Sequence, residues 1–297
     1  MIEITFLGTG SMQPTKTRNH SGILLSCKKE NILFDCGEGI QRQMRIAGIK
    51  PTRITRLCLS HWHGDHIFGL PGLLSTMGAD KPDKLLKIYG PPGTKKYFHH
   101  LFQSFIAKDM IQHELQEIRP GKIFENDHFI LEARPLRHSA PCFGYSFIEK
   151  DRRRVDLAKA RKLGLEEGPL LGRLQQGENI TFKGKKIRPE DVTDLVKGKK
   201  VSYIADTVPC PGAEELARDA DLLISEGTHL EEIKEKAGKY QHLTVKEAAL
   251  IASENNARKL LITHISQRYK HPSEIREEAR EYFPNSEVAE DFMKVKI

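Results

Sequence analysis

Four side chains of the kinds that bind metal ions lie close together in the segment His61-Trp62-His63-Gly64-Asp65-His66. A divalent transition metal takes imidazole nitrogen and carboxylate oxygen ligands at about 2.0–2.2 Å. In an extended loop, His61 and His63 lie on the same side of the backbone and can face one metal, while Asp65 and His66 can turn towards a second. A single histidine is more often a satisfied core residue, but that explanation does not account for four ligand-type residues at this spacing.

Three further candidate ligands each follow an apolar, strand-like run, and side chains at the ends of several strands of one sheet can converge at a point. These candidates are His138 after residues 129–136, Asp206 after 201–205 and His264 after 260–263. Seven residues suffice for two sites that share one carboxylate. Paired metals roughly 3.5–4 Å apart activate a water and neutralise charge on a phosphate. The sequence therefore predicts a two-metal hydrolase.

The elements that must position these residues alternate between strands and helices, which is typical of an α/β protein with mixed sheets. We find no internal repeat of 20–50 residues. The apolar patterns predict strands over 2–7, 21–26, 31–34, 56–60, 86–89, 129–136, 201–205, 221–225 and 259–263, and helices over 40–47, 66–79, 94–106, 212–219, 244–255 and 273–282.

Residues 150–200 differ from the rest of the chain in charge. They contain 15 Lys and Arg against 8 Asp and Glu, whereas the remainder is close to neutral and the whole chain has a net charge of +7. Glycine and proline interrupt the segment and no periodic apolar stripe runs through it, so we expect a mobile, projecting arm and not part of a core. Concentrated positive charge favours an anionic partner such as a phosphate backbone, although a solvated lysine-rich face has the same composition.

The bulk composition excludes several classes of protein. The 297 residues are 38% hydrophobic and hold no run of 18 apolar residues, so we expect no membrane span. The N-terminal segment lacks the basic and apolar regions of a signal peptide. The five cysteines form no Cys-x-x-Cys pair, which favours free thiols and a cytoplasmic location. Gly8 and Gly10 alone are weak evidence for a nucleotide cofactor, and we expect none.

The order of strand-end ligands resembles the metallo-β-lactamase superfamily, and several segments are similar to the ribonuclease Z family in particular. The resemblance covers essentially the whole chain. It implies an αβ/βα sandwich of two mixed sheets with outer helices over residues 1–297, with a flexible basic arm inserted at 150–198. The segments that carry the resemblance are Phe6-Leu7-Gly8-Thr9-Gly10, Pro14-Thr15-Lys16-Thr17-Arg18-Asn19, Phe34-Asp35-Cys36-Gly37-Glu38-Gly39, residues 60–73, Arg137-His138-Ser139 and the Gly-Pro-bearing stretch 168–177.

This resemblance implies a zinc-dependent endoribonuclease that removes the 3′ trailer from precursor tRNA, leaving a tRNA 3′-hydroxyl and a 5′-phosphate on the trailer. It also implies a ligand set for each of two zinc ions, with Asp65 as base or orienter of the bridging hydroxide. One zinc would be held by His61, His63, His138 and Asp206, and the other by Asp65, His66, Asp206 and His264. Nitrogen and carboxylate ligands also accept manganese or iron.

Two residues outside the ligand set have roles implied by the same resemblance. His242 matches the histidine that protonates the departing 3′ oxygen, which an alkoxide leaving group needs. The family often has His-Glu-Ala-Thr before this histidine, whereas this chain has Ser225-Glu226-Gly227-Thr228. Glu226 would polarise His242, or would only cap or pair at a strand end.

The resemblance also concerns partners and neighbouring loops. Gly168, Pro169 and Arg173 of the arm would contact tRNA, and the protein would be a homodimer in which the arm of one subunit presents tRNA to the metals of the other. Asp35 would be structural and bond loop backbone near the site. Lys16 and Arg18 would either touch phosphate or be ordinary solvated charges.

Two other functions remain open from the residues alone. A hydrolase of small phosphodiesters, thioesters or lactams would share the site, but lactamase-like zinc sites commonly have a cysteine where this chain has Asp206, and a basic arm would then have no purpose. A non-catalytic RNA-binding protein on the same scaffold would have lost a metal ligand, whereas all seven are present.

Overall fold

The computed structural model describes residues 1–80, 85–106 and 110–297. The chain divides into two compact units. The larger unit comprises residues 1–124, 131–147 and 200–297, and the smaller comprises 125–130 and 148–199. The segment predicted to form an arm, 150–198, lies entirely within the smaller unit.

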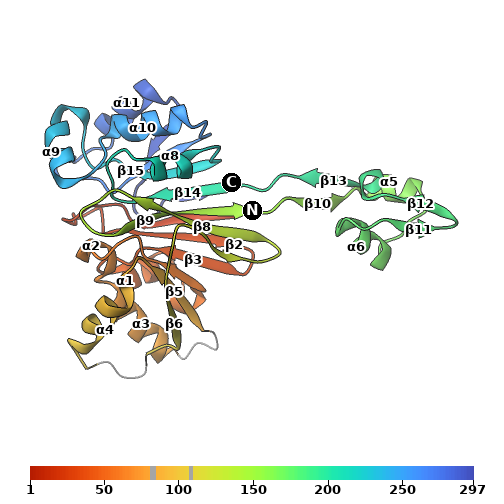
Figure 1. Cartoon of the computed structure of the whole chain (residues 1–297), viewed down its shortest axis with the longest axis horizontal. Coiled ribbons are helices and arrows are strands. Elements are labelled where there is room, and N and C mark those ends of the chain that lie inside the picture. The colour runs from red at the N-terminus through yellow and green to blue at the C-terminus, as the bar shows by residue number, and fades with distance from the viewer. Residues whose placement is uncertain (81–84, 107–109) are drawn as a thin grey trace. The chain divides into compact units, whose positions relative to one another are not determined.

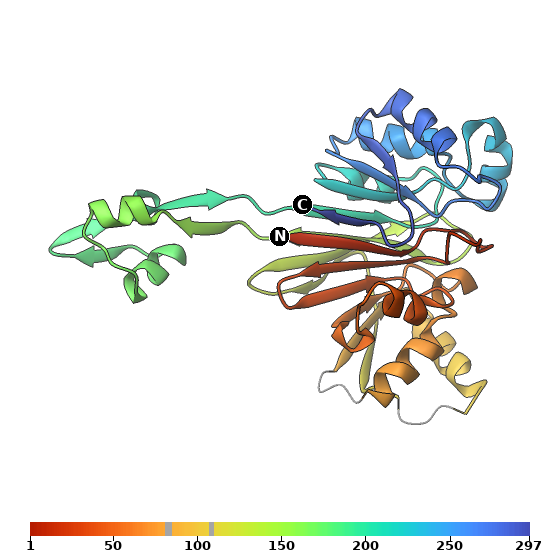
Figure 2. The ribbon, with the colours of Figure 1, turned by 180° about the vertical axis from the view of Figure 1, so that it is seen from behind.

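The first sheet of the larger unit has seven strands, and its first and last strands in sequence are neighbours. β1 pairs antiparallel with β18, so the two ends of the described chain run side by side (Figure 2). From β3 to β6 the pairing is parallel. The strand order is β18 (Lys294–Lys296), β1 (Ile2–Gly8), β2 (Gly22–Cys27), β3 (Glu30–Phe34), β4 (Arg56–Cys58), β5 (Leu86–Gly90) and β6 (His113–Glu117).

The second sheet also has seven strands, and four of them are parallel. Because parallel strands end at the same edge, Asp206, Glu226 and His264 come to that edge together. The parallel strands are the neighbours β14, β15, β16 and β17. The order is β17 (Ser286–Val288), β16 (Leu260–Thr263), β15 (Leu222–Glu226), β14 (Lys200–Ile204), β9 (Cys142–Glu149), β8 (Phe129–Leu136) and β7 (Gly121–Glu125).

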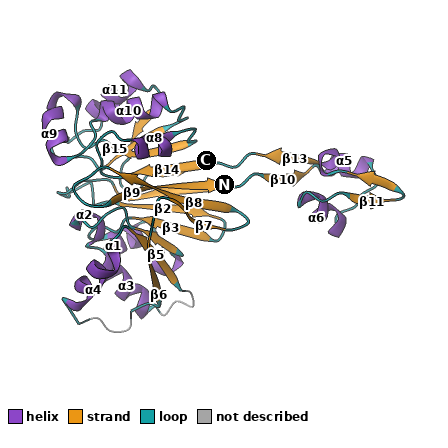
Figure 3. Ribbon diagram, in the orientation of Figure 1, coloured by secondary structure: helices purple, strands orange, loops and turns teal. Residues whose placement is uncertain are grey.

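Helices cover the outer faces of the two sheets (Figures 1 and 3). Buried aromatic side chains from both sheets pack against one another between them. Phe34 on β3 packs against Tyr145 on β9 and Tyr203 on β14, with ring centroids 5.8 Å apart in both pairs. The helices beside the first sheet are α1 (Ile40–Ile46), α2 (Gly64–Ile67), α3 (Leu70–Ala79) and α4 (Thr94–Gln103); those beside the second are α8 (Pro211–Ala217), α9 (Lys234–Tyr240), α10 (Val245–Glu254) and α11 (Ser273–Tyr282).

The smaller unit has a core of its own. β10 (Arg152–Val155) pairs with β13 (Thr193–Val196), and β11 (Ile180–Phe182) with β12 (Lys185–Ile187). Short helices α5 (Leu157–Lys162), α6 (Pro169–Gln175) and α7 (Pro189–Val192) accompany them. The expectation that this segment contributes no core was wrong, because elements of three to seven residues are too short to display an apolar period. The buried cluster is Ala160, Leu165, Leu171, Leu174, Ile180, Ile187 and Val192.

Most predicted elements of the larger unit are present, with shifts at their ends. The predicted helix over 66–79 is two helices, α2 and α3, which are separated at residues 68–69 just before a proline. The predicted strand 56–60 ends at Cys58, and residues 59–63 form the loop that carries His61 and His63. The five cysteines all lie among the described residues, and none of them forms a disulfide. None of the helices in the described part of the chain has the length and apolar composition needed to span a bilayer.

Candidate metal centre

The loop after β4 carries four of the predicted ligands, and its conformation depends on neighbouring loops. Residues 59–63 belong to no helix or strand, and α2 begins at Gly64, so that Asp65 and His66 lie on its first turn. The loop after β3 packs against this turn: Cys36 N–H donates to the His66 carbonyl at 2.8 Å. A Cβ at Gly37 would collide with the Asp65 carbonyl. Glycine at that position therefore allows the two loops to lie in contact.

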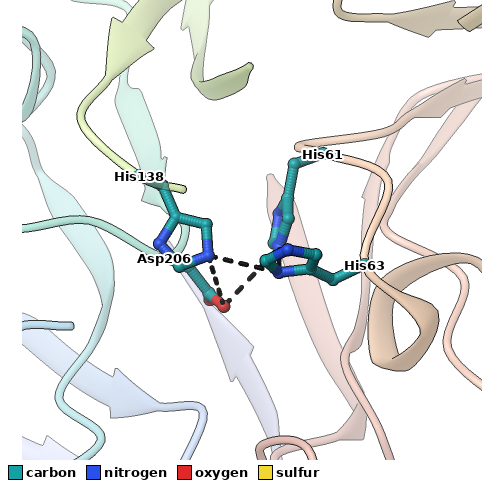
Figure 4. Close-up of side chains that lie close together, drawn as sticks. All are labelled: His61, His63, His138 and Asp206. Carbon is teal, nitrogen blue, oxygen red and sulfur yellow. Dashed lines mark hydrogen bonds and ion pairs between the residues drawn. The ribbon is translucent and has the colours of Figure 1, made fainter. Parts of the chain in front are cut away.

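All seven predicted ligand residues lie in one place, in two groups. His61, His63, His138 and Asp206 each offer a ligand atom within 4.8 Å of the others, and so do Asp65, His66, Asp206 and His264. Asp206 is common to both groups, as the sequence predicts. Figure 4 shows the first group. His61 and His63 extend from one loop, and they face His138 and Asp206, which come from two other loops.

Hydrogen bonds at the backs of the imidazole rings determine which nitrogen of each faces the centre. Four rings have Nδ1 engaged away from the centre, which leaves Nε2 as the inward ligand atom. His63 is reversed, because its Nδ1 lies 3.0 Å from His61 Nε2 and its Nε2 faces Ser139 Oγ at 3.5 Å. The four engaged pairs are His61 with Ser60 Oγ (3.0 Å), His66 with Asp35 Oδ2 (2.8 Å), His138 with the Gln241 carbonyl (3.0 Å) and His264 with Thr228 Oγ1 (2.9 Å).

The spacing of the inward atoms fits a bound cation. Ligands about 2.1 Å from a common tetrahedral centre lie about 3.4 Å from one another. His66 Nε2 and His264 Nε2 are 3.3 Å apart, and each lies 3.4 Å from a different carboxylate oxygen of Asp206. Asp206 is 2% exposed, and its Oδ1 has no hydrogen-bond partner among the described residues. A buried carboxylate is costly unless an opposite charge or a hydrogen-bond donor compensates for its charge. A cation bound between the ligands would supply that compensation.

The protonation states of His61 and Asp206 are those that a metal site requires. Burial, together with the neighbouring His66, lowers the pKa of His61 well below its usual value, so the ring is neutral and can bind a metal. Burial alone would raise the pKa of Asp206, but His264 and His66 outweigh it and hold the pKa well below the usual range. Burial would also lower the pKa of His66, but Asp206, Asp65 and Asp35 raise it well above the usual value. A proton on His66 can therefore balance the carboxylates when no cation does.

His242 and Glu226 form a buried pair beside the cluster. Glu226, at the end of β15, is fully buried, and both of its carboxylate oxygens lie 3.2 Å from His242 Nδ1. The same oxygens accept from Thr207 N–H (2.6 Å) and Thr228 Oγ1 (2.7 Å), so Glu226 holds loop groups as well as the histidine. Burial alone would lower the pKa of His242, but the Glu226 carboxylate outweighs it and raises the pKa to about 9. His242 can therefore hold a proton next to His138, whose ring centroid is 5.4 Å away.

Asp35 contacts the cluster more directly than the sequence indicates. It is fully buried and accepts hydrogen bonds from Ser60, from Tyr203 and from the ligand His66 itself. Sequence reasoning gave Asp35 only a role in bonding loop backbone and did not identify Ser60 or Tyr203 at all. The available signal was that Asp35 follows an apolar strand, as the ligands do.

Arg18 holds a loop in place through buried hydrogen bonds. Its guanidinium is buried and donates to Thr9 Oγ1 and to the Ala289 carbonyl, both at 2.6 Å. Asp291 completes this support by accepting from Thr9 Oγ1 (2.7 Å) and from Asn19 N–H (2.8 Å). A buried arginine with backbone and hydroxyl partners is not an ordinary solvated charge, so that alternative for Arg18 is wrong, and the phosphate contact stays a prediction.

Lys16 differs from Arg18 in being exposed. It lines a cavity of about 600 Å³ together with Arg42 and Lys270. Both alternatives for Lys16, a phosphate contact or a solvated charge, therefore stay open.

Comparison with known proteins identifies the family. A family model described as the anti-Pycsar protein Apyc1 matches residues 2–135, which is less than half of the chain. The ribonuclease Z of Methanothermobacter thermautotrophicus is 41% identical over 298 residues, which cover 100% of this chain and 97% of that protein. The chain belongs to the ribonuclease Z family. The predicted enzyme class, an endoribonuclease of the ribonuclease Z type (EC 3.1.26.11), is confirmed.

Solved structures agree with this ribonuclease Z assignment. The human tRNase Z, short form, superposes with a TM-score of 0.73 at 29% identity, covering 99% of both chains. The metallo-β-lactamase fold protein YhfI of Bacillus subtilis superposes with a TM-score of 0.72 at 19% identity, covering 99% of this chain and 98% of that one, and shows the fold alone. The predicted metallo-β-lactamase fold, with two mixed sheets and outer helices, is confirmed.

Proposed function

We propose that this member of the ribonuclease Z family cleaves precursor tRNA with a two-metal site and releases the 3′ trailer. The observation that carries the proposal is the pair of ligand groups that share the buried carboxylate of Asp206. The products would be a tRNA with a 3′-hydroxyl and a trailer with a 5′-phosphate.

The donor set supports zinc as the metal at both positions. His61, His63, His138 and Asp206 would hold one ion, and Asp65, His66, Asp206 and His264 the other. Imidazole nitrogens with a few carboxylates suit zinc, and manganese or iron are the alternatives. The bound metals would lower the pKa of an attacking water and neutralise charge on the scissile phosphate.

Residues of this chain would transfer the protons and orient the reacting groups. Asp65 Oδ2 lies 3.3 Å from His264 Nε2 and 3.5 Å from His66 Nε2. From that position Asp65 would orient the attacking water and accept its proton. His242 would give its proton to the departing 3′ oxygen, and Glu226 would hold His242 in place and keep it charged.

The smaller unit would supply most of the affinity for tRNA. We propose residues 150–198 as an arm inserted in the catalytic domain that spans 1–297, with Gly168, Pro169 and Arg173 among its contacts. Gly168 and Pro169 are exposed at the start of α6, and Arg173 forms an exposed ion pair with Glu178 at 2.8 Å. Further exposed cations that form no ion pair with the described residues are Arg161, Lys162, Lys185 and Lys186.

Exposed cations of this kind bind a phosphate backbone, and the binding weakens steeply with salt. The shape of the RNA, more than its base sequence, would set the register. We also propose a homodimer, in which the arm of one subunit presents tRNA to the metals of the other.

The test uses precursor tRNA labelled at both its 5′ and its 3′ end, with wild type and Asp65→Asn compared after chelation and after addition of Zn²⁺, Mn²⁺ or Fe²⁺. We expect cleavage by the metal-loaded wild type only, beside the discriminator nucleotide. The trailer should then be degraded by an exonuclease that requires a 5′-phosphate. A preference for a small phosphodiester over precursor tRNA would contradict the proposed substrate, and full activity of Asp65→Asn would contradict the proposed site.

A further inference from the structure

The buried carboxylate of Asp35 receives hydrogen bonds from both sheets. Its Oδ1 accepts from Ser60 N–H at 2.7 Å. Its Oδ2 accepts from Ser60 Oγ, from His66 Nδ1 and from the Tyr203 hydroxyl, each at 2.8 Å. Ser60 and His66 belong to the loop after β4 of the first sheet, whereas Tyr203 lies on β14 of the second. One carboxylate therefore joins the metal-ligand loop to the opposite sheet.

This arrangement fixes the hydrogen positions on one ligand of each group. A carboxylate only accepts, so His66 must carry its hydrogen on Nδ1 and turn the lone pair of Nε2 inward. A serine hydroxyl has a single hydrogen, and Ser60 gives it to Asp35. Ser60 Oγ can then only accept from His61 Nδ1, which lies 3.0 Å away. Asp35 thus determines which ring nitrogen of His66 carries the hydrogen, and through Ser60 it determines the same for His61.

Tyr203 is placed to hold Asp35 in this orientation. Its side chain is buried, and its ring packs on Phe34 with centroids 5.8 Å apart. Burial, with Asp35 nearby, raises the pKa of Tyr203 well above its usual value, so the phenol keeps its hydrogen and donates it. β14 also leads directly to Asp206, the carboxylate common to both ligand groups.

We propose that Tyr203 is a positioning residue for the metal centre. Its hydroxyl orients Asp35, and through Asp35 it orients His66 and, by way of Ser60, His61. One hydrogen bond between the two sheets thereby orients one ligand of each group. The inference rests on the proposed two-metal site, and it adds that the affinity of this site depends on a tyrosine that touches neither metal nor substrate.

The chain contains a matched control for this hydrogen bond. Tyr145 is also buried, lies on β9 of the second sheet and packs on Phe34 with centroids 5.8 Å apart. Its hydroxyl likewise donates to the first sheet, but its acceptor is the Leu59 carbonyl, at 2.6 Å, and not Asp35. Tyr145→Phe and Tyr203→Phe therefore remove the same group from similar surroundings, and only Tyr203→Phe affects Asp35.

The experiment measures zinc affinity in the whole protein. Wild type, Tyr203→Phe, Tyr145→Phe and Ser60→Ala are stripped of metal and titrated with Zn²⁺ against a chromogenic chelator. Removal of a group that orients a metal ligand typically weakens metal binding by about 10- to 100-fold, and we expect a loss in this range for Tyr203→Phe. Tyr145→Phe should bind zinc like wild type. Ser60→Ala removes the acceptor of His61 and one donor to Asp35, so it should also weaken zinc binding.

Thermal unfolding of the metal-free proteins separates positioning from general stability. Each tyrosine variant loses one buried hydrogen bond, so both should unfold at similarly lowered temperatures. Zinc affinity of Tyr203→Phe equal to that of wild type would overturn the inference, and so would an equal loss in the two tyrosine variants. Wild type that binds fewer than two zinc ions per chain would refute the proposed centre itself, and this inference with it.

Discussion

The metal centre and the smaller unit use charge in opposite ways. In the centre, charged and ionisable groups are buried, and hydrogen bonds from neighbouring loops hold them in one arrangement; Asp206 and Asp35 are 2% and 0% exposed. In the smaller unit, Lys185 and Lys186 are exposed and form no ion pair with the described residues. The proposed metal binding would depend on the placement of a few buried groups. The proposed tRNA binding by the smaller unit would depend on the number of its exposed cations.

This difference predicts separate effects on rate and on affinity. Charges in a low-dielectric interior interact strongly over short distances, whereas exposed charges are screened within a Debye length of about 8–10 Å. Substitutions in the centre should therefore change catalysis and metal binding and leave the affinity for tRNA intact. Substitutions in the smaller unit should change affinity and its salt dependence, with hydrolysis of small phosphodiesters unaffected.

The largest effect is expected for Asp206→Ala. Loss of the common ligand removes one contact from each proposed ion, and bound metals contribute several kcal/mol of transition-state stabilisation. We expect single-turnover cleavage of precursor tRNA to slow by about 10³-fold or more, with metal content reduced and tRNA affinity retained. Glu214→Ala, an exposed carboxylate on α8, is the control. Cleavage by Asp206→Ala within tenfold of wild type would show that the two groups do not act as one site.

His242→Ala should produce the next largest loss. General acid catalysis typically contributes about 10²- to 10⁴-fold, so precursor tRNA should be cleaved about 10²-fold more slowly or worse, with zinc content unchanged. A nitrophenyl phosphodiester has a leaving group that needs no proton, and its hydrolysis should be much less affected. His229→Ala is the control, because its ring lies 6.4 Å from that of His242 and contacts no proposed ligand among the described residues. An equal loss on both substrates would argue against a proton-donating role.

Charge removal in the smaller unit should have a moderate effect that is confined to binding. In the double variant Lys185→Ala/Lys186→Ala, tRNA affinity should fall by about tenfold, and the salt slope of binding should decrease by about one to two. The matched variant Lys159→Ala/Lys197→Ala removes the same charge, but both of these lysines form ion pairs, with Asp194 and Asp151 respectively. The loss of tRNA affinity in this matched variant should be smaller than in Lys185→Ala/Lys186→Ala. Equal losses would show that total charge matters and the availability of a lysine does not.

The smallest effect is expected for the ion pair of Arg173. Exposed ion pairs contribute about 0–1 kcal/mol to stability, so Glu178→Gln should scarcely change unfolding. It would leave the Arg173 guanidinium available to phosphate, and we expect tRNA to bind about twofold more tightly. Weaker binding in a filter or mobility assay would indicate that Glu178 is needed to place Arg173.

The sequence revealed the ligands because each of them has a local signal. His138, Asp206 and His264 each follow an apolar run, and their strands β8, β14 and β16 belong to one sheet. The partners of those ligands have no such signal. Tyr203 and Asp35 are 168 residues apart in sequence and meet only because two sheets pack face to face. In the sequence, a tyrosine within an apolar strand cannot be distinguished from other core residues, because the partner of its hydroxyl is known only from the structure.

Elements at the edges of the fold were missed for a different reason. β6 reads His-Glu-Leu-Gln-Glu and lies at one edge of the first sheet, where strands bury little and need few apolar residues. β17 and β18 have only three residues each. The core of the smaller unit was missed because its apolar residues are distributed over several short elements, and none of these shows a period.

The pairing of β1 with β18 has a consequence for biosynthesis. Residues 2–8 are made well before residues 294–296, which cover their edge. Until then the first sheet exposes an open strand edge, which can pair with other nascent chains. Asp291, which secures the loop beyond β1 through Thr9 and Asn19, arrives equally late. Until residues 294–296 are made, a chaperone that shields strand edges would protect the growing chain from aggregation.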